Sequence, residues 1–318
     1  PRQMTEAYEY FEEARAIDPE FSAAHAAAAN YWISQMSLTS FQLDTNELSA
    51  PAAMLQSFYE RNGIAIATAD NDIDRLQIRA TRADVDLRLR EALRLYRLYL
   101  EARPNDLIAW ASFLSTATMA SDTGAIDQAM EVFREAGQSR LEAANYFMDF
   151  AYLHLDPDDG ADYGLSAMER WPVANMIYQT HRNLLFADRV AEAAMAMREY
   201  EQRFQLHPLM MARQACAENR VDDVREILNT VYGGEVTTNS GNPMWLVFKM
   251  LGEEDKAVEV LRNFEFDGVP YLMSNWLFYS YFDPSPFPAL MAVLERENVQ
   301  RPPAITLPYA CTQAVKGL

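Results

Sequence analysis

Apolar side chains recur every three or four residues along most of this chain, in blocks of helical length separated by short polar turns. The pattern is clearest in residues 91–110, EALRLYRLYLEARPNDLIAW. Ala92, Tyr96 and Tyr99 are three or four residues apart, so they lie on one face of a helix. Pro104 cannot continue that helix, which predicts that the helix ends shortly before it.

A second helix is predicted directly after this proline. Asn105 and Asp106 are residue types that cap a helix N-terminus, and Trp110, Phe113 and Leu114 then place apolar groups on one side of the new helix. Two helices joined by a tight polar turn form a hairpin, in which each buries its apolar face against the other. Glycine and proline are sparse, 11 and 15 in 318 residues, as an all-α chain requires.

The hairpin pattern repeats along the chain. Residues 73–106 make one unit of 34 residues (106 − 73 + 1), with Ala80 and Ala92 at close-packing positions, Tyr96 at an aromatic position and Pro104 near the end. This order resembles the tetratricopeptide repeat (TPR) family, whose units recur about every 34 residues. The resemblance implies a right-handed TPR superhelix, an α-solenoid of helix–turn–helix repeats whose first helices line a concave groove.

Similar units are predicted on both sides of this one, at residues 107–143, 144–174, 175–208, 209–232, 243–266 and about 271–297. We therefore expect one TPR-like solenoid over residues 1–318, with an extended proline-rich tail at 301–318. The opening residues match only the second helix of a unit, at Ala7, Phe11, Ala14 and Pro19. This half-unit leads us to expect that the chain is the C-terminal fragment of a longer protein.

One stretch interrupts the repeats. Residues 22–72 number 51 (72 − 22 + 1), where one unit of about 34 is expected. The excess falls at residues 35–51, between a helix predicted at 22–34 and another at 52–69. We predict that residues 35–51 form no regular repeat and pack into the groove as a plug through Leu38, Phe41 and Leu43.

The formal net charge of −19 limits the possible partners. Nucleic-acid phosphates would be repelled, so this fragment is not expected to bind nucleic acid. Two interpretations of the charge stay open: it keeps the protein soluble, or it attracts a basic partner. No apolar run approaches the roughly 18 residues of a membrane span. We expect a soluble domain and favour the cytoplasm, with the periplasm as the alternative if a span lies upstream.

The sequence carries no set of residues typical of catalysis. No P-loop, nucleophile elbow or dinucleotide fingerprint occurs, and the histidines fall at packing or turn positions: His25, His154, His181 and His207. The acidic stretch DPDDGAD at 156–162 lacks the glycine and glutamate positions of an EF-hand loop, which favours an acidic turn. We expect a short helix after it that ends at Pro172. Cys216 and Cys311 fit no metal or redox spacing and leave the compartment open. We expect no enzyme, no cofactor and no metal site.

The register of the first helices gives the residues that would line the groove. The binding candidates are Asn30, Ile33, Ile108, Ser115, Gln179, Asn183 and Phe186. This small, weakly polar lining suits a closely packed peptide or helix; the alternative, a groove that only faces solvent, stays open. Some TPR proteins clamp an acidic C-terminus with lysine, asparagine and arginine. Asn30 matches one such position, but Ala26 stands where the clamp has lysine, so we expect no clamp.

The C-terminal part carries a second resemblance. Residues 282–299, FDPSPFPALMAVLERENV, look like the closing segment of bacterial multidomain signalling proteins. Those proteins carry a class III adenylate cyclase or a winged-helix DNA-binding domain upstream of a TPR half. The resemblance implies a non-catalytic protein- or peptide-interaction module with a regulatory role. The expected partner is a basic or amphipathic protein segment, or an upstream domain of the same chain. The alternative is a domain that senses a small molecule bound in the groove.

Overall fold

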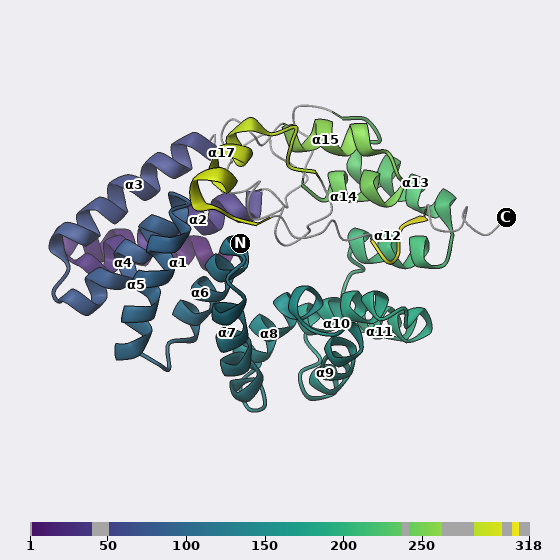
Figure 1. Cartoon of the computed structure of the whole chain (residues 1–318), viewed down its shortest axis with the longest axis horizontal. Helices are drawn as coiled ribbons and strands as arrows, with labels where there is room; N and C mark the ends of the chain where they lie inside the picture. Colours follow the sequence, from purple (N-terminus) through teal and green to yellow (C-terminus); the bar gives the residue numbers. More distant parts are fainter. Residues whose placement is uncertain (1, 40–50, 237–241, 263–282, 301–306, 312–318) are drawn as a thin grey trace. The chain divides into compact units, whose positions relative to one another are not determined.

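The computed structural model describes residues 2–39, 51–236, 242–262, 283–300 and 307–311 (Figure 1). These residues contain sixteen helices and no strand. The predicted all-α class is therefore confirmed. In chain order the helices are α1 (Arg2–Ile17), α2 (Ser22–Thr39), α3 (Pro51–Thr68), α4 (Asp72–Val85), α5 (Leu89–Ala102), α6 (Leu107–Ala120), α7 (Thr123–Ala136), α8 (Leu141–His154), α9 (Pro157–Arg170), α10 (Ala174–Phe186), α11 (Val190–Arg203), α12 (Pro208–Ala217), α13 (Val221–Tyr232), α14 (Asn242–Met250), α15 (Glu254–Arg262) and α17 (Pro288–Glu297).

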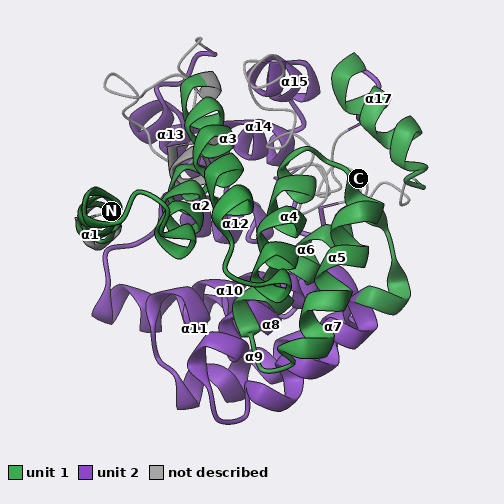
Figure 2. Cartoon of the chain, turned by 90° about the vertical axis from the view of Figure 1, so that its left-hand side faces the viewer, with its two compact units in different colours: residues 1–125, 264–274, 287–301 green, residues 126–263, 275–286, 302–318 purple. Residues whose placement is uncertain are grey.

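The chain folds as two compact units (Figure 2). Unit 1 contains α1 to α6 together with α17, and unit 2 contains α8 to α15 together with segment 307–311. The chain passes from unit 1 to unit 2 inside α7, between Ala125 and Ile126. Each unit therefore combines parts that lie far apart in the sequence. The expectation of one solenoid over residues 1–318 stays a prediction.

Within each unit, neighbouring helices pack as pairs, and alternate helices also contact one another. In unit 1, α4 packs against both α5 and α6. In unit 2, α10 packs against α8, α9, α11 and α12, and α12 packs against α14. The helices α8, α10, α12 and α14 therefore make successive contacts, as the first helices of stacked hairpins do.

The first helix of a pair often ends in the same turn. A residue with positive φ follows each of α4, α6, α10, α12 and α14: Leu87, Ser121, Asp188, Asn219 and Gly252. The next amide then bonds the carbonyl five residues back, at 2.7–3.0 Å, which is a Schellman turn. Successive turns are 34 (121 − 87), 67 (188 − 121), 31 (219 − 188) and 33 (252 − 219) residues apart, and the interval of 67 residues spans two units. The turn therefore recurs at close to the interval predicted from the sequence.

The hairpin predicted at residues 91–110 is confirmed. Helix α5 ends at Ala102, before Pro104, and α6 begins at Leu107. The side chain of Asp106 accepts hydrogen bonds from the amides of Ile108 and Ala109, both at 3.1 Å. Tyr99 donates its hydroxyl to Asp106 at 2.7 Å, and Trp110 Nε1 donates to the Pro104 carbonyl at 2.8 Å. The residues that predicted the turn therefore also hold it together.

Two helix lengths differ from the prediction. Helix α2 runs on to Thr39 instead of ending at Ser34, because residues 35–39 include no glycine or proline to stop it. Phe41 and Leu43, assigned to the groove plug, lie outside the described residues. Helix α9, predicted to be short, has 14 residues. It starts inside the acidic turn, where Asp156 caps it and accepts from the Asp158 amide at 3.1 Å, and Pro157 occupies its first turn.

The tail is not extended in the part of it that is described. The amide of Ala310 donates to the carbonyl of Leu307 at 3.2 Å, so residues 307–310 form a tight turn. Proline at the second position of a turn favours this conformation because its φ is already fixed. The expectation of an extended tail is therefore wrong for this segment.

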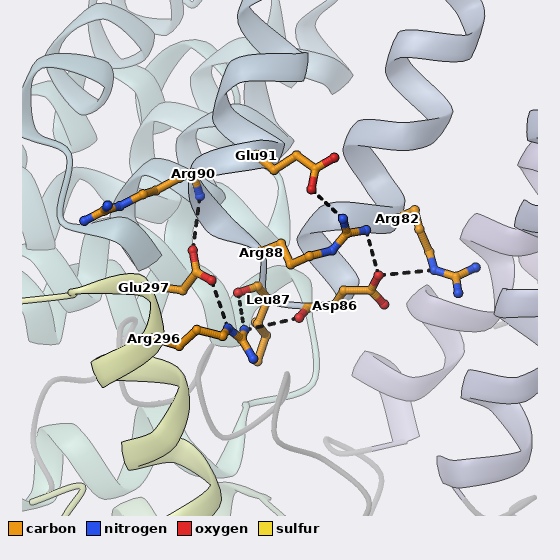
Figure 3. A network of polar contacts seen from close by, with 8 residues as sticks. All are labelled: Arg82, Asp86, Leu87, Arg88, Arg90, Glu91, Arg296 and Glu297. Carbon is orange, nitrogen blue, oxygen red and sulfur yellow. Dashed lines mark hydrogen bonds and ion pairs between the residues drawn. The ribbon is translucent and has the colours of Figure 1, made fainter.

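Helix α17 supplies a missing cap in unit 1 (Figure 3). Glu297 accepts a hydrogen bond from the main-chain amide of Arg90 at 3.4 Å, across 207 residues of sequence. Arg90 lies in the first turn of α5, and Arg88 at the N-cap position of that helix makes no side-chain cap. A carboxylate at this end of a helix also favours the helix dipole. Glu297 therefore caps the N-terminus of α5 in place of a residue next to the helix in the sequence.

Arg296 acts on the other side of the same turn. Its guanidinium donates to the carbonyl of Leu87 at 2.7 Å and to that of Asp86 at 3.4 Å. Leu87 has φ 53, a left-handed conformation that is unfavourable for a residue with a side chain. The Asp86 side chain in turn accepts from Arg82 at 3.4 Å and Arg88 at 2.9 Å. This network stabilises a strained turn between α4 and α5.

We expect Glu297→Ala to lower the free energy of unfolding by about 0.5–2 kcal/mol, the usual effect of losing an N-cap acceptor. Urea denaturation of the full chain measures it. Glu295→Ala is the matched control, since Glu295 is exposed on the same helix. Equal effects of the two substitutions would contradict the capping role.

Candidate functional site

Helix α10 is the centre of the candidate site in unit 2. Five consecutive polar residues on it are buried: Gln179, Thr180, His181, Arg182 and Asn183. Consecutive residues point to different sides of a helix, so α10 is enclosed on several sides. Buried polar groups need hydrogen-bond partners. The helices around α10 supply many of these partners.

A row of polar side chains joins α8 to α10. Asn175 Nδ2 donates to Asn145 Oδ1 at 3.4 Å, and Gln179 Nε2 donates to a carboxylate oxygen of Asp149 and, at 3.5 Å, to Asn175 Oδ1. We call Asn145, Asp149, Asn175 and Gln179 the amide ladder. Asn175 is exposed, and Asn145 and Asp149 are half-buried. The ladder therefore reaches the surface of unit 2.

Asp149 is the titratable member of the amide ladder. Burial raises the pKa of Asp149 to about 6, although the positive charge of Arg182 and hydrogen bonds from Asn175 and Gln179 oppose this. Arg182 also donates to the Asp149 main-chain carbonyl at 3.1 Å, and its guanidinium carbon lies 3.6 Å from the centre of the Tyr152 ring. Near pH 6 the carboxyl group is therefore present in both forms, and its acid form can donate a hydrogen bond.

The opposite side of α10 faces α12. His181 Nε2 lies 3.0 Å from Gln214 Oε1, and Arg213 donates to the Tyr178 hydroxyl at 3.0 Å. Burial lowers the pKa of His181 to about 3, helped by the positive charge of Arg213. His181 is therefore neutral at physiological pH and bonds as a packed side chain.

The interpretation of the other histidines as packed or turn residues is also confirmed. His25 Nε2 lies 2.9 Å from the Pro19 carbonyl, and His154 stacks on the ring of Phe150. His207 Nδ1 accepts from the Leu209 amide at the start of α12, at 3.2 Å. Burial lowers the pKa of both His154 and His207 to about 4. Across the described ranges, no group of three potential metal-ligating side chains comes together.

Segment 307–311 lies against α10 and α12. Its buried residues alternate with half-exposed ones, at Leu307, Tyr309 and Cys311. The ring of Tyr309 meets that of Phe186 edge-on, with 5.8 Å between centres, and the Arg213 guanidinium lies 6.0 Å from the Tyr309 ring. Burial raises the pKa of Tyr309, against the positive charges of Arg213 and Arg182. A turn of the chain thus occupies the surface beside a predicted groove residue.

A disulfide joins Cys216 of α12 to Cys311 of this segment, across 95 residues. The spacing of the two cysteines does not predict this bond. The one available signal was that the chain has two cysteines, a number that can pair completely. Spacing could not show the pairing, because the fold alone brings the two Cα atoms to 4.5 Å.

The predicted residues on α10 have different surroundings. Gln179 belongs to the amide ladder, and half-buried Phe186 contacts both Tyr152 and Tyr309. Asn183 is buried and donates to the Gln179 carbonyl at 2.9 Å. Its Oδ1 lies against Gly160 of α9, and a Cβ added to this glycine would be only 2.7 Å from that oxygen. Asn183 is therefore used inside the helix packing.

The four other predicted residues belong to unit 1. Asn30 is exposed on α2, and Ile33 is half-buried there against the core cluster of Ala29, Phe58 and Val85. Ile108, at 59% exposure, and half-buried Ser115 lie on α6. The seven candidates are therefore divided between two units. Asn145 and Asn175 were missed, although each lies near the start of a predicted unit, 144–174 and 175–208.

Neither the models of known protein families nor the curated protein sequences give a match to this chain. Among the helices of the described ranges, none combines the length and the apolar composition needed to cross a membrane.

Proposed function

We propose that the chain is a TPR-like α-solenoid that acts as a protein-interaction module. Two observations support the repeat assignment: the left-handed turn that recurs after 31 to 34 residues in three of its four intervals, and the contacts between alternate helices. Repeat units of this kind stack their hydrophobic faces and present the first helices to a partner. The proposed binding surface is the amide ladder and the adjoining faces of α8, α10 and α12.

The amide ladder is the observation that carries this proposal. A carboxamide both donates and accepts hydrogen bonds, which matches the alternating N–H and C=O groups of a peptide main chain. Asn145 and Asn175 lie side by side at 3.4 Å and reach the surface. The ladder therefore suits an extended peptide whose main chain exchanges hydrogen bonds with these side chains.

The partner is expected to be basic or amphipathic. The chain has 46 acidic against 27 basic side chains, a formal net charge of −19. Such a charge speeds the encounter with a positive partner, and salt weakens this attraction because it screens the charges. The resemblance of residues 282–299 to the closing segment of bacterial signalling proteins supports a non-catalytic, regulatory role in a protein of that kind.

Small-molecule sensing is the less favoured function. Such a site needs polar groups that converge on an enclosed space. The polar groups around Arg213 instead contact side chains of unit 2, Tyr178 at 3.0 Å and the ring of Tyr309 at 6.0 Å. A surface that already holds a turn of polypeptide favours a peptide ligand.

We expect the double variant Asn145→Ala/Asn175→Ala to bind a labelled, lysine- and leucine-rich amphipathic peptide about tenfold more weakly than the unaltered chain. Loss of two hydrogen bonds of about 0.7 kcal/mol each accounts for this factor. Fluorescence titration at low and high salt measures it, and affinity is expected to fall as salt rises.

Gln202→Ala is the matched control for this titration. It removes an exposed carboxamide from α11, the second helix of its pair, in the same unit. Equal loss of affinity in the control and the ladder variant would contradict the proposed surface. Turnover of a substrate by the purified chain would overturn the proposal as a whole.

A further inference from the structure

The Cys216–Cys311 disulfide ties a segment of the chain to the proposed binding surface. Cys216 lies in the last turn of α12, and Cys311 ends the described segment 307–311. Two residues before Cys311, the Tyr309 ring packs against Phe186 and faces Arg213. The disulfide therefore keeps Tyr309 packed against the faces of α10 and α12 that belong to the proposed binding surface.

Contacts without a covalent bond hold so short a segment weakly. Ordering five residues costs conformational entropy, and this cost is comparable to the gain from burying two large side chains, here Leu307 and Tyr309. A cross-link changes the balance because it keeps the segment at a high effective concentration next to its site. The state of the disulfide therefore decides how firmly the surface is covered.

We propose that the Cys216–Cys311 disulfide is a thiol-controlled latch on this surface. While the two Sγ atoms are bonded, segment 307–311 occupies the faces of α10 and α12. After reduction the segment leaves, and the same faces bind a segment of another protein with similar chemistry: an apolar residue, a proline and a tyrosine in a turn. This inference rests on the proposed interaction function. It adds, for the faces of α10 and α12, the chemistry of the segment that binds there and the redox condition for that binding.

The surface under Tyr309 explains this choice of partner. The Arg213 guanidinium lies 5.2 Å from the ring centre of Tyr178 and 6.0 Å from that of Tyr309, a distance at which a cation attracts an aromatic face. Phe186 meets the Tyr309 ring edge-on, a favoured aromatic arrangement. An incoming tyrosine therefore finds the same two contacts.

We take the reductant to be a dithiol, either a small molecule or a dithiol protein. A thiolate of the reductant attacks one Sγ, the S–S bond breaks, and the leaving cysteine thiolate takes up a proton. The second thiol of the reductant then attacks the mixed disulfide and releases the other cysteine. Two electrons pass to the protein, which gains two thiols, and the reductant becomes a disulfide.

The first test follows hydrogen exchange of the full chain with and without dithiothreitol. We expect the amides at 307–311 to exchange at least about tenfold faster after reduction, because the segment then opens freely. The double variant Cys216→Ser/Cys311→Ser should behave like the reduced chain without reductant. Helices α4 and α5, in unit 1, serve as an internal control and should not change. Unchanged exchange at 307–311 in the reduced chain overturns the latch.

The second test adds the partner in trans. The probe is a labelled peptide with the sequence of residues 305–313, in which serine replaces cysteine. We expect it to bind the reduced chain at least about tenfold more tightly than the oxidised chain, since only the reduced surface is open. Phe186→Ala should weaken this binding. Phe204→Ala, at a half-buried aromatic residue that packs on Tyr200 in the same unit, should not.

The outcomes separate the two proposals. Equal binding of the probe to both redox forms, or no binding to the reduced chain, overturns the inference about the latch and its partner. Loss of probe binding in Phe186→Ala together with an unaltered response of the amide-ladder variant to the amphipathic peptide supports the latch and contradicts the ladder. Unaltered probe binding by Phe186→Ala, together with weaker binding of the amphipathic peptide by the amide-ladder variant, supports the ladder and contradicts the latch.

Discussion

We expect Asp84→Asn to change the free energy of unfolding more favourably at pH 7.5 than at pH 4. Burial raises the pKa of Asp84 from 3.8 to about 6, while a hydrogen bond from the Thr116 hydroxyl, 2.6 Å long, opposes this. As the pH rises from about 4, the unfolded chain loses the proton first, so stability falls until the folded carboxyl ionises near pH 6. Asparagine cannot ionise, yet it keeps an oxygen that accepts from Thr116.

The size of this effect follows from the pKa shift. Roughly two pKa units correspond to about 3 kcal/mol as an upper limit. Asp84 still reaches solvent in part, so we expect the advantage of the variant to grow by about 1–2 kcal/mol between pH 4 and pH 7.5. Comparing the two pH values cancels any cost of the substitution that does not depend on pH.

Urea denaturation at the two pH values measures this difference. Asp70→Asn is the control, because Asp70 is exposed and its carboxylate is solvated in both the folded and the unfolded chain. We expect a small difference for that variant. If Asp84→Asn and Asp70→Asn respond equally to pH, burial of Asp84 does not carry the effect.

Ala80→Leu is expected to destabilise unit 1 by about 1–3 kcal/mol, the usual cost of overpacking a filled core. Ala80 is fully buried on α4, the helix that packs against α5 and α6. A leucine there has no space unless the neighbouring helices move apart. The midpoint of thermal unfolding should therefore fall.

Arg79→Leu is the matched control for this prediction. Arg79 precedes Ala80 on the same helix and is exposed, so the same leucine side chain meets solvent instead of the core. An unchanged unfolding midpoint for Ala80→Leu would mean that the register assigned to residues 73–106 is wrong.

The sequence predicts the helices well because their signals are local. Ala92, Tyr96 and Tyr99 repeat at helical spacing, and Pro104 with Asp106 marks a stop and a start. The left-handed turns were not predicted, since glycine occupies only one of the five, Gly252. At Leu87 and Ser121 the packing of the two helices imposes a conformation that the residue types do not announce.

The candidate site is harder to predict because its contacts join distant segments. Register alone suggested Gln179 and Phe186, and the structure gives them partners in Asp149 and Tyr309. It could not place Asn183 toward α9, because one residue in a helix turns the side chain by about 100° and small errors in register change its neighbours. The disulfide depends on the fold of unit 2, which no spacing encodes.

The capping of α5 by Glu297 has a consequence for synthesis of the chain. Residues 90 and 297 are separated by 207 positions, so the contact forms only after the intervening residues have left the ribosome. Contacts of such high sequence separation form late and pay a large loop-closure entropy. Until unit 2 has been synthesised, the N-terminus of α5 therefore has no cap from Glu297, and the strained turn between α4 and α5 has no contact with Arg296. A chain that ends before α17 should therefore lack the last helix of unit 1, although the other helices of that unit are synthesised first.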